Sequence, residues 1–329
     1  MKTKIGGKEL IEEAAKLIKE GEVVAFPTET VYGLGADAFN KDAVEKIFKA
    51  KGRPADNPLI VHLSSKDQLN KVAIDIPKEA YILIDAFSPG PLTLILNRHP
   101  DIPNITTSGL NTVGIRFPNN KLAQMLISKS DTPIAAPSAN ISGRLSPTTG
   151  QAVYEDMNGK IPMILDDGKC QVGIESTVLD LTKKPYTILR PGAISAKMLA
   201  PYLSDVKNFE GEVKIVTAPG MKYKHYAPLC PCVGVKKAKN AINHYDKVLD
   251  TITDKVVIIG NDFFLNLIPD KYNKISIGKT PTECMALFFD TMREAEKKYK
   301  YIILQNFEDY PEFYSLNNRI EKSTAHIIV

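Results

Sequence analysis

The chain has 329 residues, of which 43% are hydrophobic and 24% charged, and its formal net charge at pH 7 is +4. This length exceeds one ordinary hydrophobic core and predicts two globular domains. The small basic excess excludes a protein wrapped in nucleic acid along its whole length, so any contact with RNA should be local.

The cysteines and the apolar runs bear on compartment. The four cysteines are Cys170, Cys230, Cys232 and Cys284. Their spacing fits neither a disulfide framework nor a zinc pattern, so we expect free thiols in a reducing cytosol. The first twenty residues lack the layout of a signal peptide, and no apolar run approaches the ~18 residues of a membrane span. The sequence therefore predicts a soluble, cytoplasmic protein with no metal site of its own.

A helix, a buried strand and a loop are predicted first. Apolar residues between Leu10 and Ile18 repeat at helical spacing, and Gly21 is placed to end this helix. Val23–Phe26 is a short apolar run, which is typical of a buried strand. Thr28–Asp37 is rich in threonine and glycine, and we expect it to be an exposed loop.

More elements follow as far as Leu203. Asn40 or Asp42 is suited to cap a helix that carries Val44 and Phe48 on one face. Further short strands are expected at Leu59–Leu63, Leu92–Leu96, Val113–Phe117, Ile134–Ala136, Met163–Leu165, Ser176–Leu181 and Thr187–Leu189. This pattern predicts an α/β or α+β domain with a large sheet over residues 1–203.

A second, smaller domain is expected after a linker. Residues 204–232 lose periodicity and gain Pro, Gly and Lys, which indicates an interdomain linker. An amphipathic helix between Met285 and Tyr299 lies between strand-like runs at Val256–Ile259 and Tyr301–Leu304. Residues 233–329 are therefore expected to form a small three-layer α/β domain.

Two glycine motifs resemble phosphate-binding loops but have the wrong spacing. Gly33-Leu-Gly35 resembles a dinucleotide fingerprint, yet residues 27–32 separate it from the preceding strand and the next helix begins late. Gly278-Lys-Thr280 resembles the end of a P-loop, yet Asn273 stands where that loop needs its first glycine. Neither motif is expected to bind a nucleotide.

Two cations stand together on a proline-bounded turn at a predicted helix end, in Lys51-Gly-Arg53-Pro54. Arginine offers bidentate hydrogen bonds and lysine a mobile point charge, a combination that suits a polyphosphate. Taken alone, the pair is better explained as solvated charges that complement the helix dipole. In the same way, His62 alone is better explained as a histidine within its strand, and Thr30 as a hydroxyl that caps a loop.

Further polar turns favour a nucleotide site. Ala136-Pro-Ser-Ala-Asn140 follows a strand and presents small polar groups, although an ordinary turn has the same composition. Ser146-Pro-Thr148, Gly173-Ile-Glu-Ser-Thr177 and Arg190-Pro-Gly192 add hydroxyls and an arginine at other strand edges. Hydroxyls and cations placed repeatedly at strand ends predict one polar cleft.

Several long motifs resemble the YrdC-type threonylcarbamoyl-AMP synthases in their long, two-domain form. They are Phe26-Pro-Thr-Glu-Thr-Val-Tyr-Gly-Leu-Gly35, Lys51-Gly-Arg53, Asn57-Pro-Leu59, Pro137-Ser-Ala-Asn140 and Ala218-Pro-Gly-Met-Lys-Tyr-Lys-His-Tyr-Ala-Pro228. The resemblance implies a twisted mixed α/β sheet with a concave basic cleft, a linker that folds over the active site, and a small Rossmann-like domain. It also implies a nucleotidyltransferase that makes L-threonylcarbamoyl-AMP and pyrophosphate from L-threonine, bicarbonate and ATP, for the threonylcarbamoyladenosine modification of tRNA.

The resemblance further implies which residues form the site, with Lys51 and Arg53 as the catalytic pair. ATP would be bound by Lys51, Arg53, Asn57, Thr112, Ser138, Asn140, Ser146, Thr148, Arg190 and Tyr226. Threonine would be bound by Thr30, Tyr32, His62, Arg116, Ser138 and Ser176. Arg116 would pair with the carboxylate of threonine, and His225 and Tyr226 would form a strap over the occupied site.

The same resemblance sets the expected cofactor and partners. Mg²⁺ is expected with the phosphates of ATP, and no organic cofactor is expected. Beyond the substrates, we expect the downstream machinery that transfers threonylcarbamoyl to tRNA, a weak RNA contact and no membrane contact. The stretch Phe313–Arg319 departs from the family, which tends towards glycines before its Asn-Arg pair.

Two other functions fit parts of the chain. The main alternative is a non-catalytic RNA-binding module that uses the basic concave face, with an affinity that falls steeply with salt. The first domain also resembles a carbamoyl-transfer domain of hydrogenase maturation, but the four cysteines do not supply the zinc-binding region of that family.

Overall fold

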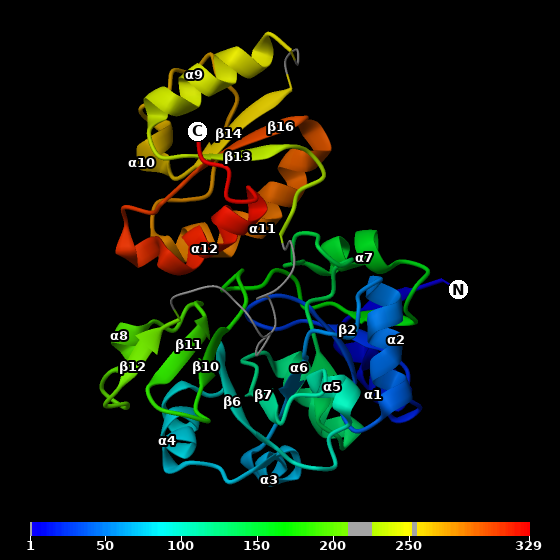
Figure 1. Cartoon of the computed structure of the whole chain (residues 1–329). Helices are drawn as coiled ribbons and strands as arrows, with labels where there is room; N and C mark the ends of the chain where they lie inside the picture. Colours follow the sequence, from blue (N-terminus) through cyan, green and yellow to red (C-terminus); the bar gives the residue numbers. More distant parts are fainter. Residues whose placement is uncertain (1, 210–225, 252–254) are drawn as a thin grey trace. The chain divides into compact units, whose positions relative to one another are not determined.

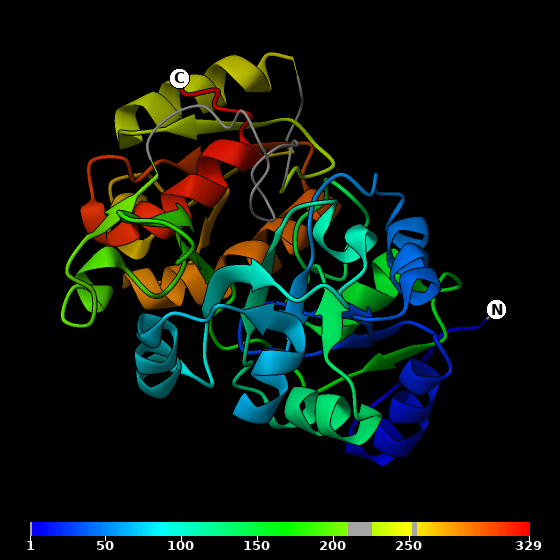
Figure 2. The ribbon, with the colours of Figure 1, turned by 60° about the horizontal axis from the view of Figure 1, so that its bottom comes forward.

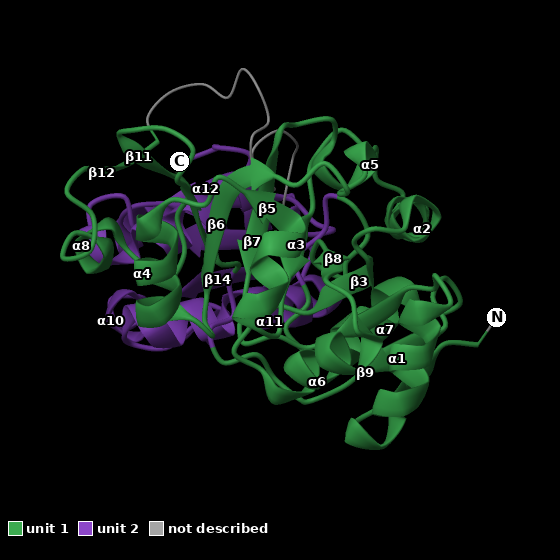
Figure 3. Cartoon of the chain, turned by 90° about the horizontal axis from the view of Figure 1, so that it is seen from below, with its two compact units in different colours: residues 1–142, 147–171, 175–223 green, residues 143–146, 172–174, 224–329 purple. Residues whose placement is uncertain are grey.

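The computed structural model describes residues 2–209, 226–251 and 255–329. These residues form two compact units, and each is described by itself (Figures 1 and 3). Unit 1 consists of Met1–Ser142, Pro147–Gln171 and Glu175–Tyr223, and unit 2 of Gly143–Ser146, Val172–Ile174 and Lys224–Val329. Two short segments from within the predicted first domain, residues 1–203, thus belong to the C-terminal unit, which nothing in the sequence indicated.

Unit 1 is built on one mixed sheet. Its strands are β1 (Lys4–Gly6), β2 (Val24–Phe26), β3 (Gly33–Asp37), β4 (Ile60–His62), β5 (Ala73–Ile74), β6 (Leu92–Arg98), β7 (Thr112–Arg116), β8 (Ile134–Ala136), β9 (Met163–Leu165), β10 (Thr177–Asp180), β11 (Tyr186–Arg190) and β12 (Val206–Asn208). Their order is β1-β9-β2-β3-β8-β4-β7-β6-β10-β11-β12, with β5 paired to β6. β4 runs parallel to β7, whereas β6 and β8 run antiparallel to these strands. The predicted mixed α/β sheet is confirmed.

Helices cover both faces of this sheet. They are α1 (Ile11–Lys19), α2 (Lys41–Lys51), α3 (Leu69–Val72), α4 (Lys78–Phe87), α5 (Asn104–Thr107), α6 (Lys121–Ser130), α7 (Gly150–Met157) and α8 (Ala196–Leu199), with 3-10 turns at Lys8–Leu10 and Lys66–Gln68. Figure 2 shows α1 (blue) beside α6 (green), and the two helices bury a core with Phe26 and Ile134 on one face. A larger core, which includes residues of α2 and α4, fills the other face.

Two predicted helix boundaries are confirmed. The Asn40 side chain accepts hydrogen bonds from the backbone N–H groups of Asp42 and Ala43, so Asn40 is the N-cap of α2. Gly52 ends this helix in the left-handed conformation, with φ 61°. The chain turns away there at no steric cost, because glycine has no Cβ. α1 ends at Lys19, and Gly21 follows with φ 75°.

The expected exposed loop over Thr28–Asp37 is wrong. Gly33–Asp37 forms β3, which pairs antiparallel with β2, and the segment before it is buried. A Cβ at Gly35 would lie 2.7 Å from the Phe26 ring and 2.6 Å from Ile134. Glycine is therefore needed so that neighbouring side chains can lie across this strand, and the same glycines gave the segment its loop-like composition. A strand at Gly33–Asp37 also confirms that the first glycine motif is not a dinucleotide fingerprint.

One part of the predicted linker forms a strand, and another part lies outside the described residues. Val206–Asn208, inside the range given to the linker, forms edge strand β12 and pairs in parallel with β11. The periodicity of three residues is too short to reveal such a strand from sequence. His225 lies outside the described residues.

Unit 2 is a small parallel α/β unit, as expected for a Rossmann-like domain. Its elements are β13 (Cys232–Val235), α9 (Ala238–Leu249), β14 (Val256–Gly260), α10 (Asp262–Leu265), β15 (Lys274–Ser276), α11 (Pro281–Lys298), β16 (Tyr301–Gln305), a 3-10 turn at Pro311–Phe313 and α12 (Tyr314–Ser323). The strands pair in parallel in the order β13-β16-β14-β15. No described helix combines the length and the apolar character that crossing a bilayer requires.

The second glycine motif of the sequence forms a helix cap. Thr280 and Glu283 form a capping box at the start of α11, and the Glu283 carboxylate accepts hydrogen bonds from the backbone N–H groups of Lys279 and Thr280. A protein carboxylate therefore takes the place that a phosphate would need at this helix N-terminus. The rejection of a P-loop is confirmed.

Candidate functional site

Three neighbouring strands of unit 1 place polar side chains in one row across the sheet. His62 ends β4 and is in register with Arg116 at the end of β7, which is in register with Thr93 of β6. Residues in register point to the same face. His62 is also in register with Ile134, whose side chain belongs to the core beneath α1 and α6. The row of His62, Arg116 and Thr93 therefore extends that face of the sheet with polar groups.

Arg116 is held in this row by a buried carboxylate. Its Nη2 atom lies 2.7 Å from Oε2 of Glu29, and the two side chains are 5% and 4% exposed. Among the described residues the Oε1 and Oε2 atoms of Glu29 have no hydrogen-bond partner, so the contact is one of opposite charges without hydrogen-bond alignment. A buried guanidinium is costly unless a carboxylate accompanies it. Arg116 is thus buried with Glu29 as its counter-charge.

His62 is a neutral neighbour of Arg116. Burial, and secondarily the positive charge of Arg116, lower the pKa of His62 from 6.5 to about 3. Its Nδ1 lies 3.1 Å from the carbonyl oxygen of Ile60, and its ring packs edge-to-face against Phe26 with centroids 5.7 Å apart. At neutral pH the imidazole is therefore uncharged and suited to hydrogen bonding and shape recognition rather than to proton transfer.

Two hydroxyl groups continue the row. The Oγ1 of Thr93 and the Oγ of Ser176 are 2.7 Å apart, and both residues are buried. Arg190 donates from Nη2 to Ser176 Oγ at 3.1 Å, and its Nε and Nη2 also donate to the Ser176 carbonyl oxygen. Arg190 therefore fixes Ser176 next to Thr93, in addition to the ATP contact predicted for it.

Thr30 and Tyr32, both predicted to bind threonine, are fully buried in the loop before β3. The Thr30 Oγ1 lies 2.9 Å from the Oγ1 of Thr28. The Tyr32 hydroxyl lies 2.6 Å from Asp166 Oδ1 and 2.7 Å from the Gly168 carbonyl oxygen. Burial, together with the hydrogen bond to Asp166, raises the pKa of Tyr32 well above its ordinary value. The Tyr32 hydroxyl is therefore hydrogen-bonded within the protein, and these bonds hold the loop before β3 against residues 166–168.

Lys51 is the centre of a second cluster. It is only 3% exposed, and its Nζ donates to the carbonyl oxygens of Ser138 and Asn140, both at 2.5 Å. The Ser138 hydroxyl in turn donates to Asn140 Oδ1. A buried lysine that fastens a distant turn is no solvated helix-end cation, so that simpler interpretation of Lys51 is wrong.

One loop connects the two clusters. Gly33 forms a bridge with Ser138, and the Ala139 N–H donates to the Tyr32 carbonyl oxygen at 2.8 Å. The same loop carries Glu29, which reaches Arg116. Asp37, at the far end of β3, is in register with Ile134 and so with the His62 row. Gly33 and Asp37 are four residues apart, a rise of about 13 Å along a strand. The backbone positions of the two clusters therefore differ along β3, and the loop before β3 contacts both of them.

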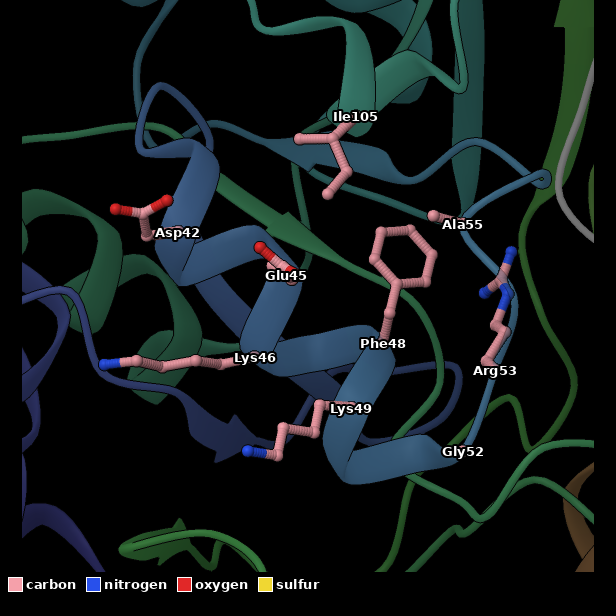
Figure 4. Close-up of a pocket in the computed structure, with 9 residues that line it drawn as sticks. All are labelled: Asp42, Glu45, Lys46, Phe48, Lys49, Gly52, Arg53, Ala55 and Ile105. Atoms are coloured by element: carbon pink, nitrogen blue, oxygen red, sulfur yellow. The ribbon is translucent and has the colours of Figure 1, made fainter.

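Arg53 and Asn57 lie beside the Lys51 cluster. Arg53 donates from Nη2 to the Asn57 carbonyl oxygen at 2.8 Å, and its guanidinium lies 5.7 Å from the centre of the Phe48 ring. Arg53, Phe48 and Ile105 line a hollow of about 630 Å³ (Figure 4). Asn57 is fully buried, and neither polar atom of its side chain has a partner among the described residues. An unpaired buried amide is costly and suits a group that a ligand completes.

The remaining predicted residues are Thr112, Thr148, Ser146 and Tyr226. Thr112 begins β7, four residues and about 13 Å from Arg116, so it does not join the row. Thr148 is buried, and its Oγ1 has no partner among the described residues. Ser146 and Tyr226 are buried and belong to unit 2.

Comparison with known proteins identifies the family. Residues 16–192 match the model of the Sua5, YciO and YrdC proteins, which is described as telomere recombination. Residues 194–325 match the C-terminal domain of threonylcarbamoyl-AMP synthases. The chain belongs to this family. The family predicted from the motifs is thereby confirmed for both domains.

Individual family members cover nearly the whole chain. The threonylcarbamoyl-AMP synthase of Pyrococcus abyssi is 40% identical over 99% of this chain and 98% of its own length. That of Bacillus subtilis is 39% identical over 97% of this chain and 94% of its own length. The crystal structure of P. abyssi Sua5 complexed with L-threonine matches with a TM-score of 0.92 at 38% identity, and the match covers 99% of each chain.

Reasoning from sequence missed three residues that contact the predicted site residues. Glu29 is a charged residue in a segment whose composition indicated an exposed loop, so its burial against Arg116 was not expected. Thr93 stands in an apolar run and reaches the row only through the register of β6 with β7. Asp166 accepts a hydrogen bond from the Tyr32 hydroxyl, although the two residues are 134 positions apart in the sequence. Only Glu29 had a signal, because it lies inside the motif that resembles the family.

Proposed function

We propose that the chain is an L-threonylcarbamoyladenylate synthase. It joins L-threonine, bicarbonate and ATP to give L-threonylcarbamoyl-AMP and pyrophosphate, which serves the threonylcarbamoyladenosine modification of tRNA. The observation that carries the proposal is the buried row of His62, Arg116 and Thr93, with Ser176 beside it. A guanidinium next to paired hydroxyl groups is the complement of an amino acid that has a carboxylate and a hydroxyl. The related P. abyssi Sua5 was crystallised with L-threonine.

Threonine binding follows from the charges of this row. Its carboxylate would bind at Arg116, which contacts the carboxylate of Glu29 in the structure. Bidentate pairing with a guanidinium fixes the orientation of a carboxylate as well as its position. The threonine hydroxyl would join the Thr93 and Ser176 hydroxyls, and neutral His62 adds no second charge that competes with Arg116.

The reaction needs alignment more than a protein nucleophile. The amine of threonine attacks the carbon of carbon dioxide and loses a proton, or attacks the carbon of bicarbonate with loss of water, and either route gives a carbamate anion. A carbamate oxygen then attacks the α-phosphorus of ATP in line, and the bond to the β-phosphate oxygen breaks as pyrophosphate leaves. Because the carbamate is already anionic and labile, catalysis consists of positioning, charge neutralisation and exclusion of water.

The Lys51 cluster would hold the nucleotide. Lys51 fixes the Ser138–Asn140 turn. Arg53, two residues further along the chain, would neutralise the charge that develops on the leaving pyrophosphate. Asn57 and Thr148 contribute buried polar atoms that have no protein partner among the described residues and that ATP would satisfy.

We also propose that Mg²⁺ arrives bound to the phosphates of ATP. Among the described residues no three His, Cys, Asp or Glu side chains gather into a metal-binding group. Glu29 and Asp166 contact Arg116 and Tyr32. The proposed roles of Arg116, Lys51 and Arg53 require no metal ligand from the protein.

The chemistry of the product bears on where the enzyme works and with which partners. An acyl-adenylate is reactive and short-lived in water, so it must pass to a downstream transferase that acts on tRNA. We propose that the protein works in the cytoplasm with that machinery, and that its own contact with RNA is weak, in keeping with a net charge of only +4.

Pyrophosphate release measured with each substrate omitted in turn tests the proposal. The full mixture of ATP, threonine and bicarbonate should release pyrophosphate, and omission of threonine or bicarbonate should abolish it. Mass spectrometry should detect the adenylate of carbamoylated threonine. Release that does not depend on threonine would refute the assignment. Salt-sensitive RNA binding without ATP turnover would support a non-catalytic RNA-binding module instead.

A further inference from the structure

Helix α11 of unit 2 carries a glutamate that binds the Gly143–Ser146 segment. The Arg144 Nη2 lies 2.5 Å from Glu296 Oε1, and the Glu296 side chain is only 3% exposed. Gly143–Ser146 comes from the middle of the first family domain, directly before Pro147 and Thr148. Within unit 2, an ion pair whose carboxylate is buried therefore holds the segment that ends at Ser146 against α11.

A second side chain of the same helix binds the next residue of the segment. Arg293 is 3% exposed and donates from Nη2 to the carbonyl oxygen of Leu145. Arg293 and Glu296 are three residues apart, so they lie on the same face of α11. Between them they hold Arg144 by its side chain and Leu145 by its backbone, which leaves little freedom for Ser146.

The second short segment of unit 2, Val172–Ile174, also packs on α11. A Cβ at Gly173 would lie 2.4 Å from the Met285 carbonyl oxygen and 2.5 Å from the Ala286 Cα. Gly173 also has φ 77°, a conformation that other residues rarely adopt. The backbone of this segment thus lies directly against the backbone of the helix. Ser176, in the predicted threonine site, follows Ile174 by two residues.

The same glutamate holds the chain that leaves the predicted strap. The Leu229 N–H donates to Glu296 Oε2 at 2.7 Å, and the Ala227 N–H donates to the Gly143 carbonyl oxygen at 3.0 Å. The Tyr226 ring packs against Phe289 of α11, with centroids 5.2 Å apart. One face of α11 therefore holds three separate pieces of chain, each next to a residue predicted to bind a substrate.

We propose that α11 is a positioning element for both substrates, and that Arg144, Glu296 and Arg293 set the place of Ser146 towards ATP while Gly173 sets that of Ser176 towards threonine. The C-terminal domain then acts in catalysis without touching the reacting atoms. This inference rests on the proposed function for the roles of Ser146 and Ser176. It gives the second domain of this chain a part in placing the substrates.

Steady-state kinetics of full-length variants test the proposal. Arg144→Ala and Glu296→Gln should raise the KM for ATP by about 10- to 100-fold, the effect of a misplacement on the order of 1 Å, and change the KM for threonine less than twofold. Arg144→Lys should recover part of the loss, because it keeps the charge but not the planar guanidinium. The matched control is Glu294→Gln on the same helix, whose partner is the exposed Lys297. It should leave both constants unchanged.

Gly173→Ala tests the threonine half and should raise the KM for threonine more than that for ATP. Unfolding midpoints of all variants separate positioning from general destabilisation. If Gly173→Ala fails to fold, Arg144→Ala and Glu296→Gln alone test the inference. Equal changes in both KM values, or values like those of Glu294→Gln, would overturn the inference. A wild-type enzyme without threonine-dependent pyrophosphate release would instead refute the proposed function.

Discussion

Glu29 and Arg116 form a buried ion pair in which Oε2 and Nη2 are 2.7 Å apart. The pair joins the loop before β3 to the end of β7, and it occupies the guanidinium that is proposed to bind the threonine carboxylate. Because the contact lacks hydrogen-bond alignment, we expect a substrate carboxylate with better geometry to replace it. Glu29 thus balances the charge of Arg116 from within the protein.

Glu29→Gln tests this balance. The variant leaves Arg116 buried without a counter-charge, so its free energy of unfolding should fall by about 3 kcal/mol. Saturating threonine should recover part of that loss, because its carboxylate then neutralises Arg116. The measurement is chemical denaturation with and without threonine. A threonine-induced gain no larger in Glu29→Gln than in the wild type would contradict the exchange.

Arg116→Ala should chiefly affect threonine. Loss of one member of a desolvated charge pair costs about 2–5 kcal/mol, so the KM for threonine should rise by about 10²-fold or more while that for ATP changes little. Arg116→Ala combined with Glu29→Gln controls for the unpaired carboxylate and should be more stable than the single variant. A threonine KM near that of the wild type in both variants would remove Arg116 from the site.

Arg53→Ala should chiefly affect the rate of adenylation. If Arg53 stabilises the charge on the departing pyrophosphate, its loss should lower kcat by about 10²- to 10³-fold. Lys49→Ala, four positions earlier and exposed, removes the same charge from the end of α2 and should leave kcat unchanged. Pyrophosphate release under saturating substrates distinguishes them, and near wild-type adenylation by Arg53→Ala would show the assignment to be wrong.

His62 predicts a specific dependence of stability on pH. Its folded-state pKa of about 3 lies below the ordinary 6.5, so the unfolded chain takes up the proton first. The stability contributed by neutral His62 is complete above pH 6.5 and is lost as the pH falls from 6.5 towards 3. Between pH 6.5 and 5.0 the loss should be about 2 kcal/mol. Urea unfolding should show a smaller loss for His62→Gln, whereas His326→Gln, at an exposed position, should behave like the wild type.

Local sequence was sufficient for elements that local chemistry specifies. The helical spacing of α1, the Asn40 cap of α2 and the apolar runs at β8 and β9 were all predicted, because spacing, caps and burial act within a few residues. The prediction of a loop before α2 was wrong because the glycines of β3 are required by contacts with Phe26 and Ile134, which lie elsewhere in the chain.

The candidate site likewise has a part that the sequence predicted and a part that only the structure showed. The motif around Lys51 and Arg53 and the family resemblance predicted a nucleotide-binding synthase from residues alone, and the family is confirmed. By contrast, Glu29 and Thr93 have meaning only beside Arg116 and Ser176, partners separated by more than eighty positions. Sequence patterns report the period of an element but not its register with a neighbour, and the register of β6 with β7 is what places Thr93 beside Arg116. The fold of the loop before β3 places Glu29 there.

The chain alone therefore determined the fold class, the order of the elements and the family, since these follow from hydrophobic period, caps and long ordered motifs. Only the tertiary structure decided that Lys51 is buried against the Ser138–Asn140 turn, that Glu29 neutralises Arg116, and that α11 holds the segments before Ser146 and Ser176. Each is a contact between groups distant in sequence. The free energy of such a contact depends on burial and distance, and neither is fixed until the sheet has formed and the helices have packed on it.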